Sequence, residues 1–409
     1  MAKEYKDLVI ALDIGTAKVM VVVAEVLPGG ELKLAGLGIA PSNGLKSGVV
    51  VNIDATVQSI QQALKEAELM ADCKITRVHT GITGSHIRGI NSSGMVAIKD
   101  REVSAADVAR VVETAKAINI STDQRLLLVE PQEFIIDGQD VKEPIGMSGI
   151  RLEAKVHIVT GAQSAAENII KCVRRCGLEV EQLMLNPLAS SLSVLTEDER
   201  ELGVALVDIG AGTTDVAIFT NGAIRHTSVI PIAGDLITSD IAMALRTPTK
   251  DAEDIKVESG YAKQLLADPD SQVEVPGLGD RGPRMLSRQA LAGVIEPRVE
   301  EIFSLVHQVM RESGFEEMLS SGIVLTGGSC IMPGMVELGE DIFLKPVRRG
   351  IPKYSGALSD MVAQPRAATV MGLLEDARLA RLRGFKVAQK NGSMKTAFSQ
   401  VKDWFVGNF

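Results

Sequence analysis

The sequence predicts an α/β protein built from two similar lobes that face each other across a cleft. One glycine-rich stretch lies between two apolar runs and reads VALVDIGAGTTDVAIF at 204–219. A related stretch about half a chain earlier reads VIALDIGTAKVMVVV at 9–23. In both copies a turn and a third apolar run follow, at 32–39 and at 223–232. Short β-branched runs are typical of buried strands, and a repeat at long spacing indicates a repeated architecture. We therefore expect two β-β-β-α-β-α halves.

The turn inside each stretch has the chemistry of a phosphate site. Gly210 and Gly212 permit backbone angles that other residues resist, and they let backbone N–H groups approach a phosphate closely. Thr213 and Thr214 can donate hydrogen bonds, and Asp208 can hold Mg²⁺ through water. A single stretch of this kind is often only a turn. Two Asp-Ile-Gly hairpins brought face to face could grip one polyphosphate from both sides.

Length and composition narrow the class of protein. A chain of 409 residues with 45% hydrophobic residues exceeds one usual core, so we expect two or more domains. No run of eighteen apolar residues indicates a membrane span, and the N-terminus does not have the pattern of a signal peptide. The four cysteines form no Cys-x-x-Cys pair, which favours a reducing cytoplasm. The net charge of −9 argues against a nucleic-acid partner.

In the first half we expect a lobe core at 1–84 and 163–201. An apolar face formed by Ile60, Leu64 and Ala67 predicts a helix at 55–70, and a strand is predicted at 78–82. Pro187 suits the first turn of a helix at 188–195. A further helix is predicted at 163–175 and a short strand at 183–185.

Residues 85–162 have a different character, because glycines interrupt the stretch SHIRGINSSGMVAIKD. Ser104 and Asp107 predict a capped helix that runs to about residue 118. Strands are predicted at 125–134 and 150–159. We interpret this region as a small α/β insertion, and the alternative is that it continues the first half without a break.

The second half is expected to have its core at 202–232 and 306–383, with a subdomain at 233–305. The predicted helices lie at 238–245, 252–267, 287–313 and 365–382. A loop with one short strand is predicted at 268–284, and a buried strand runs into paired glycines at 322–328. A polar linker at 384–393 then leads to a terminal helix at 394–409.

A third glycine turn, LTGGS at 325–329, completes a nucleotide-type pattern, because paired glycines let a flat ring or a ribose approach the backbone. Ligands of α/β sheets lie outside the carboxyl ends of strands. The three stretches together resemble the two phosphate motifs and the adenosine motif of the actin, DnaK-type chaperone and sugar-kinase superfamily. More closely, the chain resembles the FtsA family of bacterial cell-division actin homologues. The stretches that carry this resemblance are GITGSHIRGI at 81–90, PIGMSGIRLE at 144–153, LTEDEREL at 195–202 and VIEPR at 294–298.

The resemblance implies an actin-like two-lobed ATPase fold that binds ATP with Mg²⁺. It implies that phosphates are cradled by residues of both hairpins, which are Asp13, Gly15, Thr16, Lys18, Asp208, Gly210, Gly212, Thr213 and Thr214. Asp13 and Asp208 would hold the metal through water. Gly327, Gly328 and Ser329 would border the adenosine. Lys256 lies where relatives place a lysine that contacts the base, and the alternative is a solvated helix lysine.

One segment departs from the chaperone pattern, in which a Glu precedes Pro. Here it reads NPLAS at 186–190, and Asn186 cannot act as a general base. Asp215 remains as the candidate catalytic carboxylate, and the alternative is a solvated Asp at the start of a strand. We therefore expect ATP binding with at most weak ATPase activity.

The resemblance also implies partners. The 233–305 subdomain would receive the C-terminal peptide of the tubulin homologue FtsZ. Positive charge there comes from Arg281, Arg284, Arg288 and Arg298, and Arg288, Glu296 and Arg298 are the candidate contacts. An ordinary solvated arginine face is the alternative. The chain would assemble with itself into a filament, and the 85–162 insertion would recruit later division proteins.

The last sixteen residues have an apolar helical face, and Trp404 in it is the only tryptophan of the chain. Such a helix is typical of peptides that lie in a membrane interface, with lysines reaching the headgroups. The candidate membrane contacts are Phe398, Val401, Lys402, Trp404 and Phe405. The alternative is a last helix docked on the body.

The function expected from the resemblance is an ATP-binding cell-division protein that polymerises and tethers the FtsZ ring to anionic lipids on the cytoplasmic face of the cell membrane. Two alternatives stay open within the same superfamily. One is a pilus-type assembly scaffold, and the other is a small-molecule kinase of the sugar-kinase type.

Overall fold

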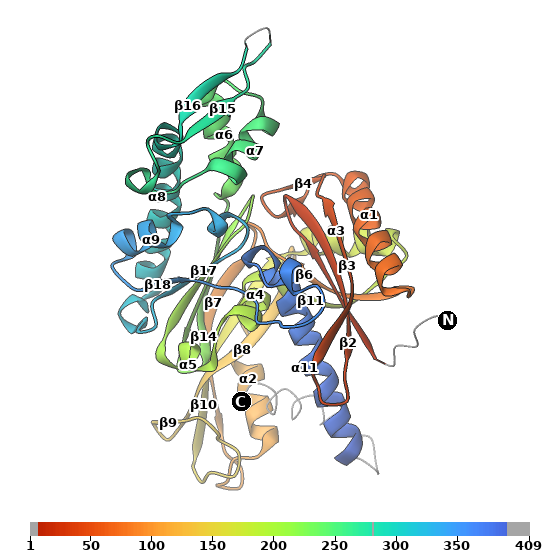
Figure 1. Cartoon of the computed structure of the whole chain (residues 1–409). Coiled ribbons are helices and arrows are strands. Elements are labelled where there is room, and N and C mark those ends of the chain that lie inside the picture. The colour runs from red at the N-terminus through yellow and green to blue at the C-terminus, as the bar shows by residue number, and fades with distance from the viewer. Residues whose placement is uncertain (1–6, 280–281, 391–409) are drawn as a thin grey trace.

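The computed structural model describes residues 7–279 and 282–390, and its two lobes are each built on a five-stranded sheet (Figure 1). The first sheet contains β1 (Leu8–Ile14), β2 (Lys18–Val26), β3 (Leu32–Pro41), β6 (Arg77–Ile82) and β11 (Glu179–Leu185). The second contains β12 (Val204–Ile209), β13 (Thr214–Thr220), β14 (Ala223–Ile230), β17 (Ile323–Thr326) and β18 (Val347–Arg349).

The two sheets have the same topology. Their strand orders are β11-β6-β1-β2-β3 and β14-β13-β12-β17-β18, so the first strand of each half is central. In each half it pairs antiparallel with the second strand and parallel with the fourth. This confirms the predicted repeat, and it places the two glycine turns at corresponding positions.

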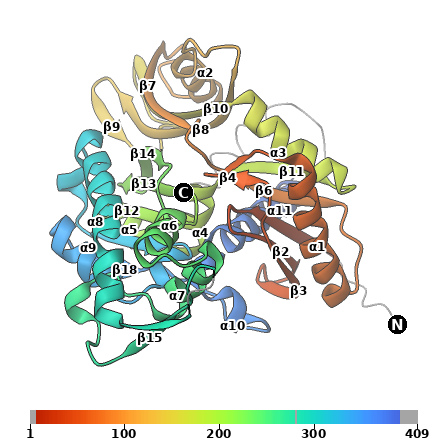
Figure 2. The ribbon, with the colours of Figure 1, turned by 90° about the horizontal axis from the view of Figure 1, so that it is seen from above.

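Helices cover both sheets and join them. In the first lobe α1 (Ile53–Ala71) and α3 (Gln163–Arg175) pack on one face, and α1 lies so close to β3 that a Cβ on Gly38 would be 1.8 Å from the carbonyl oxygen of Ala63. In the second, α8 (Arg288–Ser313) and α9 (Met335–Phe343) pack on the sheet, with Phe303 and Phe343 in contact at 5.1 Å between ring centroids. Between the lobes lie α4 (Asn186–Val194) and α11 (Ala368–Lys390), which contact each other (Figure 2).

Several short elements connect these parts. They are β4 (Leu45–Lys46), β5 (Val49–Val50), α5 (Glu197–Leu202), α10 (Ser359–Val362) and the 3-10 turns η2 (Glu316–Met318), η3 (Ser329–Ile331) and η4 (Pro365–Ala367). The β4–β5 hairpin belongs to the first lobe and carries Ser47 and Gly48 at its turn.

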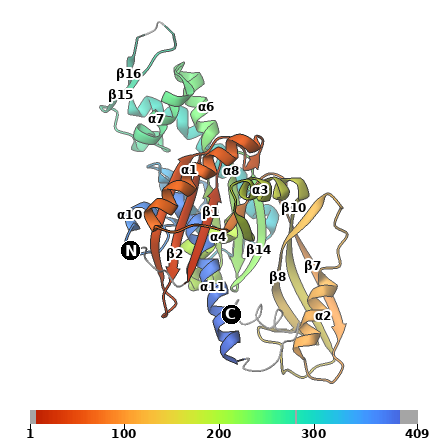
Figure 3. The ribbon, with the colours of Figure 1, turned by 90° about the vertical axis from the view of Figure 1, so that its right-hand side faces the viewer.

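The insertion between β6 and α3 has its own sheet, which lies beside β14 of the second lobe (Figure 3). It contains β7 (Arg88–Ala97), α2 (Ala105–Ala115), β8 (Gln124–Ile136), β9 (Gln139–Val141) and β10 (Arg151–Ala162), and the strand order is β7-β10-β8-β9. The capping box of Ser104 and Asp107 is present. The ten-residue β7 was not expected, because its glycines resemble loop residues. They serve close packing instead, since a Cβ on Gly94 would lie 2.4 Å from Ala115 N.

The second-lobe subdomain lies between β14 and α8, at the top of Figure 1. It contains α6 (Gly234–Leu245), α7 (Thr249–Ser259), η1 (Gln264–Leu266) and a hairpin of β15 (Gln272–Val275) and β16 (Arg284–Ser287). The prediction of one helix over 252–267 is wrong. Helix α7 ends at Ser259, and the chain turns away after Gly260, where Ala262 N donates to Pro333 O. The prediction of one strand at 268–284 missed β16.

At the C-terminal end, α11 runs to Lys390, so the prediction of a linker from residue 384 is wrong for 384–390. The polarity of these residues suggested a linker, but polar residues can also continue a helix. The predicted terminal helix at 394–409, with its membrane contacts, lies outside the described residues. Within 7–279 and 282–390, no helix is both long and apolar enough to span a bilayer.

Candidate functional site

The two glycine turns have matching backbone geometry. Gly15 N donates to Lys18 O at 2.9 Å, and Gly210 N donates to Thr213 O at the same distance. In the first hairpin Asp13 lies opposite Met20, and in the second Asp208 lies opposite Asp215. The second hairpin therefore carries one more carboxylate than the first.

In the first lobe, Asp13 is buried at the end of β1 and pairs with Lys18, whose Nζ lies 3.3 Å from Asp13 Oδ2. Thr16 Oγ1 accepts a hydrogen bond from Gly48 N at 3.1 Å. The turn of the β4–β5 hairpin is thus tied to the first glycine turn.

In the second lobe, Asp208 is buried and held by two hydroxyl groups from the helices between the lobes. Ser190 of α4 donates to Asp208 Oδ2 at 2.5 Å, and Thr369 of α11 lies 3.4 Å from the same oxygen. Burial raises the pKa of Asp208 above its ordinary value, and the negative charge of Asp13 acts in the same direction. An added cation would relieve this electrostatic cost.

Asp215 is 3% exposed, so the alternative of a solvated Asp is wrong. Thr83, at the end of β6 in the first lobe, donates a hydrogen bond to Asp215 Oδ1. Burial raises the pKa of Asp215, and the nearby charge of Asp208 raises it further. The contact joins the two lobes directly.

The two phosphate-type turns touch. A Cβ built on Gly212 would lie 2.7 Å from Thr16 Oγ1 and 2.9 Å from Ser47 Cα. Only a residue without a side chain allows this approach between the lobes. The predicted phosphate residues of both halves are therefore brought together.

The third glycine turn lies beside them. Gly327 has a φ of +87°, and a Cβ there would lie 2.4 Å from Asp208 Oδ1. Ser329 Oγ donates to Gly210 O at 2.8 Å. By contrast, the nearest atom to a Cβ on Gly328 would be Arg366 Cβ at 3.8 Å, so a ligand could approach the backbone at this position.

Lys256 lies next to this turn and is 8% exposed, so the alternative of a solvated helix lysine is wrong. Its Nζ donates to Thr238 Oγ1 at 2.9 Å and to Gly234 O at 3.2 Å, and it pairs with Glu253 at 2.6 Å. A Cβ on Gly234 would be 2.4 Å from Ser329 Oγ, which shows how closely the lysine and the glycine turn approach.

Sequence reasoning missed Ser190, Thr369, Thr83 and Glu253. Thr83 could have been found, because it ends a predicted strand on the same sheet edge as Asp13. Asn186, which replaces the Glu of the chaperone pattern, has a buried Oδ1 without a protein partner, facing Gly81.

Among the described residues, no group of three or more His, Cys, Asp or Glu side chains is arranged to hold a metal ion. A metal at Asp13 and Asp208 would therefore need water and ligand oxygens as further ligands.

The predicted peptide contacts lie on or near α8. Arg298 pairs with Asp240 at 2.5 Å and also with Glu301, and Glu296 accepts from Gln264 N at 2.9 Å. Arg288 begins α8, and its Nε is buried without a hydrogen-bond partner. Arg281 lies outside the described residues.

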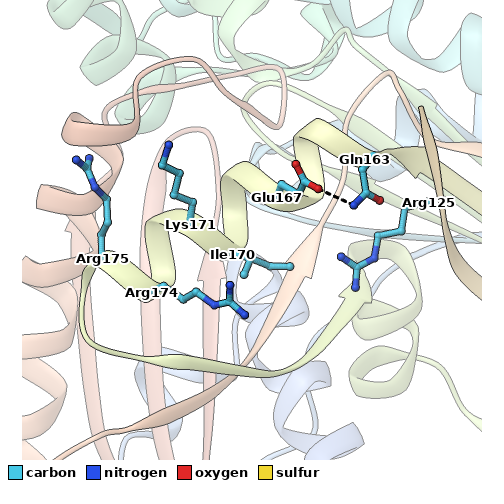
Figure 4. Close-up of a pocket in the computed structure, with 7 residues that line it drawn as sticks. All are labelled: Arg125, Gln163, Glu167, Ile170, Lys171, Arg174 and Arg175. Atoms are coloured by element: carbon cyan, nitrogen blue, oxygen red, sulfur yellow. Dashed lines mark hydrogen bonds between the residues drawn. The ribbon is translucent and has the colours of Figure 1, made fainter. Parts of the chain in front are cut away.

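A pocket of about 700 Å³ lies elsewhere, between the insertion and the first lobe (Figure 4). Arg125 of β8 and Lys171, Arg174 and Arg175 of α3 make it basic, and Glu167 hydrogen-bonds with Gln163 at its edge. The pocket is separate from the glycine turns.

Comparison with solved structures places this fold in a known class. The PilM-PilN type IV pilus biogenesis complex matches with a TM-score of 0.65 and 17% identity, over 92% of this chain and 99% of that chain. MreB5 of Spiroplasma citri bound to AMPPNP matches with a TM-score of 0.57 and 16% identity, over 95% of this chain and 100% of that one. The chain thus has the actin-like ATPase fold.

Comparison with protein sequences defines the family. The model "Cell division protein FtsA" matches residues 205–372, and "SHS2 domain inserted in FTSA" matches residues 84–160. Cell division protein FtsA of Pseudomonas aeruginosa is 54% identical over 98% of both chains, and that of Escherichia coli K12 is 45% identical over 99% of both. This chain belongs to the FtsA family, and it is a cell-division actin homologue.

Proposed function

We propose that this chain binds ATP with Mg²⁺ between its lobes, assembles with copies of itself, and tethers FtsZ to the cytoplasmic face of the cell membrane at the division site. The observation that carries the nucleotide step is the contact between the two matched turns, where Gly212 approaches Thr16 and Ser47. One polyphosphate could be held there by backbone N–H groups from both lobes.

The residues present fit the cofactor. Asp13 and Asp208 are buried carboxylates on facing sheet ends, and Lys18 alone among the predicted phosphate residues supplies positive charge. Bound Mg²⁺ would neutralise phosphate charge and carboxylate charge together. Gly328 would leave the backbone accessible to the adenosine, and Lys256 would approach the base. The fold relatives bound to ADP and AMPPNP support this assignment.

The nucleotide step is tested by titrating Mg²⁺-ATP into the full chain by calorimetry. Asp208→Ala should weaken binding at least tenfold, and Gly210→Val should abolish it by filling the phosphate turn. Asp198→Ala, on α5 and outside the site, is the control. Parent-level affinity in both site variants would overturn the assignment.

FtsZ binding is assigned to the 233–305 subdomain, where Arg288 begins α8 and Arg298, paired with Asp240, lies further along the same helix. Acidic or amphipathic peptides bind such surfaces through charge pairs and apolar anchors. Family membership supports FtsZ as the division partner. Binding of FtsZ that persists after removal of its C-terminal peptide would contradict this step.

Membrane attachment is assigned to the 394–409 sequence from its amphipathic pattern. A short interfacial helix binds reversibly, because each large apolar side chain contributes roughly 1.5–3 kcal/mol and the helix must be ordered. Linking copies in a filament would raise avidity by roughly 10²–10⁴. Self-association and membrane attachment therefore reinforce each other in this proposal.

Recruitment of later division proteins is assigned to the 85–162 insertion.

A further inference from the structure

The insertion belongs to the first lobe by chain order but makes most of its side-chain hydrogen bonds to the lobes with the second. It leaves the first lobe after β6 and returns at α3, yet its side chains hydrogen-bond with β14. We call this contact the seam. Its members are Asn91, Gln132, Glu133 and His157 of the insertion, and Ile224, Arg225 and Thr227 of β14.

Two amides of the seam cover the free edge of the second-lobe sheet. Strand β14 is an edge strand, whose outward carbonyl groups need partners. Gln132 Nε2 donates to Ile224 O at 2.9 Å, and Asn91 Nδ2 donates to Arg225 O at 3.1 Å. Side chains therefore take the place of a neighbouring strand.

His157 holds the centre of the seam and is 1% exposed. The Asn91 amide nitrogen is used on Arg225 O, so the Asn91 oxygen faces the ring, and Nδ1 of His157 donates to it at 2.6 Å. Nε2 then accepts from Thr227 Oγ1 at 2.9 Å. A Cβ on Gly89 would lie 2.6 Å from Thr227 Oγ1, so the two backbones also approach closely.

An ion pair closes the seam. The buried guanidinium of Arg225 donates to Glu133 at 2.6 Å and, through Nε, to Thr220 Oγ1 at 2.9 Å. Separating these groups would leave a buried charge unpaired, which costs more than breaking an exposed pair.

The contact of the insertion with the first lobe is mainly apolar, apart from the backbone bond from Gln163 N to Asp123 O at 2.8 Å. Ile87 and Val159 lie in the apolar cluster of the first-lobe core, with Leu127 and Leu128 packed against it. Apolar contacts are not directional and can slide at low cost, whereas hydrogen bonds need fixed partners. If the lobes move relative to each other, the insertion should follow the second lobe.

We propose that the insertion acts as a relay between the lobes. The seam makes it move with the second lobe, so that nucleotide binding changes its position against the first lobe. Strand β14 links the two sites, because Thr214 of the phosphate hairpin pairs with Ile230 and its Oγ1 donates to Ile232 O at 2.7 Å. The basic pocket of Figure 4 spans the boundary that would slide, since Arg125 is on β8 and Lys171 is on α3. The relay rests on the proposed nucleotide binding.

The test is hydrogen–deuterium exchange of the full chain with and without Mg²⁺-ATP, with ATP affinity measured in parallel. The seam variant is Asn91→Ala/Gln132→Ala, and the control is Ser93→Ala/Gln139→Ala, two exposed polar residues of the same sheet outside the seam. In the parent and the control, ATP should change exchange in β13, β14, β8 and α3.

In the seam variant the change in β13 and β14 should persist, the change in β8 and α3 should fall at least threefold, and ATP affinity should stay within twofold. Thr227→Val, which removes only the hydroxyl bonded to His157, is the milder second variant if the first unfolds. An unaltered response of β8 and α3 in a folded seam variant, or no response in a parent that binds ATP, would overturn the relay alone. Absence of ATP binding in the parent would overturn the proposed function, and the relay with it.

Discussion

Thr83 and Asp215 form a hydrogen bond between the lobes, with the hydroxyl of Thr83 as donor. The two residues are separated by 132 positions in the chain and lie at facing strand ends of two equivalent sheets. Asp215 has Met20 as its counterpart in the first hairpin, so this bond is not duplicated by the repeat. It adds one buried hydrogen bond to the contact between the lobes.

Thr83→Val should lower the free energy of unfolding by about 1–3 kcal/mol, because a buried carboxyl group loses a hydrogen bond. Urea unfolding measures the change. Thr76→Val, at an exposed threonine just before the same strand, is the matched control and should change stability far less. Equal effects of the two substitutions would show that the contact with Asp215 does not stabilise the fold.

Gly212→Ala should push the two phosphate turns apart, because its Cβ would lie 2.7 Å from Thr16 Oγ1. Overpacking of this kind costs about 1–3 kcal/mol. Affinity for Mg²⁺-ATP should fall about tenfold, which corresponds to about 1.4 kcal/mol. Gly29→Ala is the control, since no atom lies within 4 Å of a Cβ there. Unchanged affinity of the Gly212 variant would mean that the turns need not touch during binding.

We expect the folded chain to lose stability at acidic pH because of His157 in the seam. Burial and, to a smaller extent, the neighbouring His226 lower the pKa of His157 to about 4. Between the unfolded-state pKa of about 6.5 and the folded-state value, the unfolded chain binds the proton and the folded chain does not, so stability falls as pH falls. This residue alone should make the free energy of unfolding about 2 kcal/mol lower at pH 5 than at pH 7.

His157→Gln should reduce that pH dependence. Urea unfolding of the parent and the variant at both pH values gives the difference directly. Because the lowered pKa values of His79 and His86 act on both proteins alike, the difference between the two pH slopes belongs to His157 and its interaction with His226. Identical slopes would assign the acid sensitivity to other groups.

Trp404→Glu should release the chain from anionic vesicles while Mg²⁺-ATP binding persists, because a charge replaces the large apolar side chain of the proposed membrane face. Trp404 is the only tryptophan, so a blue shift of its fluorescence on adding vesicles also reports insertion by the parent. Gln400→Glu adds the same charge on the polar face and should bind like the parent. Vesicle binding by the Trp404 variant at the parent's level would refute the membrane role.

The sequence predicted the parts of the fold that depend on local pattern. Both Asp-Ile-Gly hairpins, the equal topology of the halves and the capping box at Ser104 follow from apolar periodicity and turn chemistry. Strand β7 was missed because Gly89 and Gly94 are there for close packing against β14 and α2, which only the tertiary structure shows. Helix α7 was predicted too long because the turn at Gly260 depends on a distant contact with Pro333.

The carboxylates and glycines of the candidate site could be predicted from the sequence. The hydroxyl groups that hydrogen-bond to those carboxylates could not. Asp208 is held by Ser190 and Thr369, which are 18 and 161 positions away and come from the two helices between the lobes. No local pattern marks such residues. In the same way, the sequence suggested an insertion at 85–162 but gave no sign that it would contact the second lobe.

The central claim is that nucleotide-dependent assembly tethers FtsZ to membrane, and cosedimentation of FtsZ with anionic vesicles tests it most directly. Vesicles, FtsZ and the full chain should be pelleted with and without Mg²⁺-ATP, and with excess FtsZ C-terminal peptide as competitor. We predict that FtsZ pellets with the vesicles only when the chain is present, more so with Mg²⁺-ATP, and that the peptide releases it. FtsZ that stays in the supernatant while the chain itself pellets, or pelleting that neither ATP nor the peptide changes, would contradict the account.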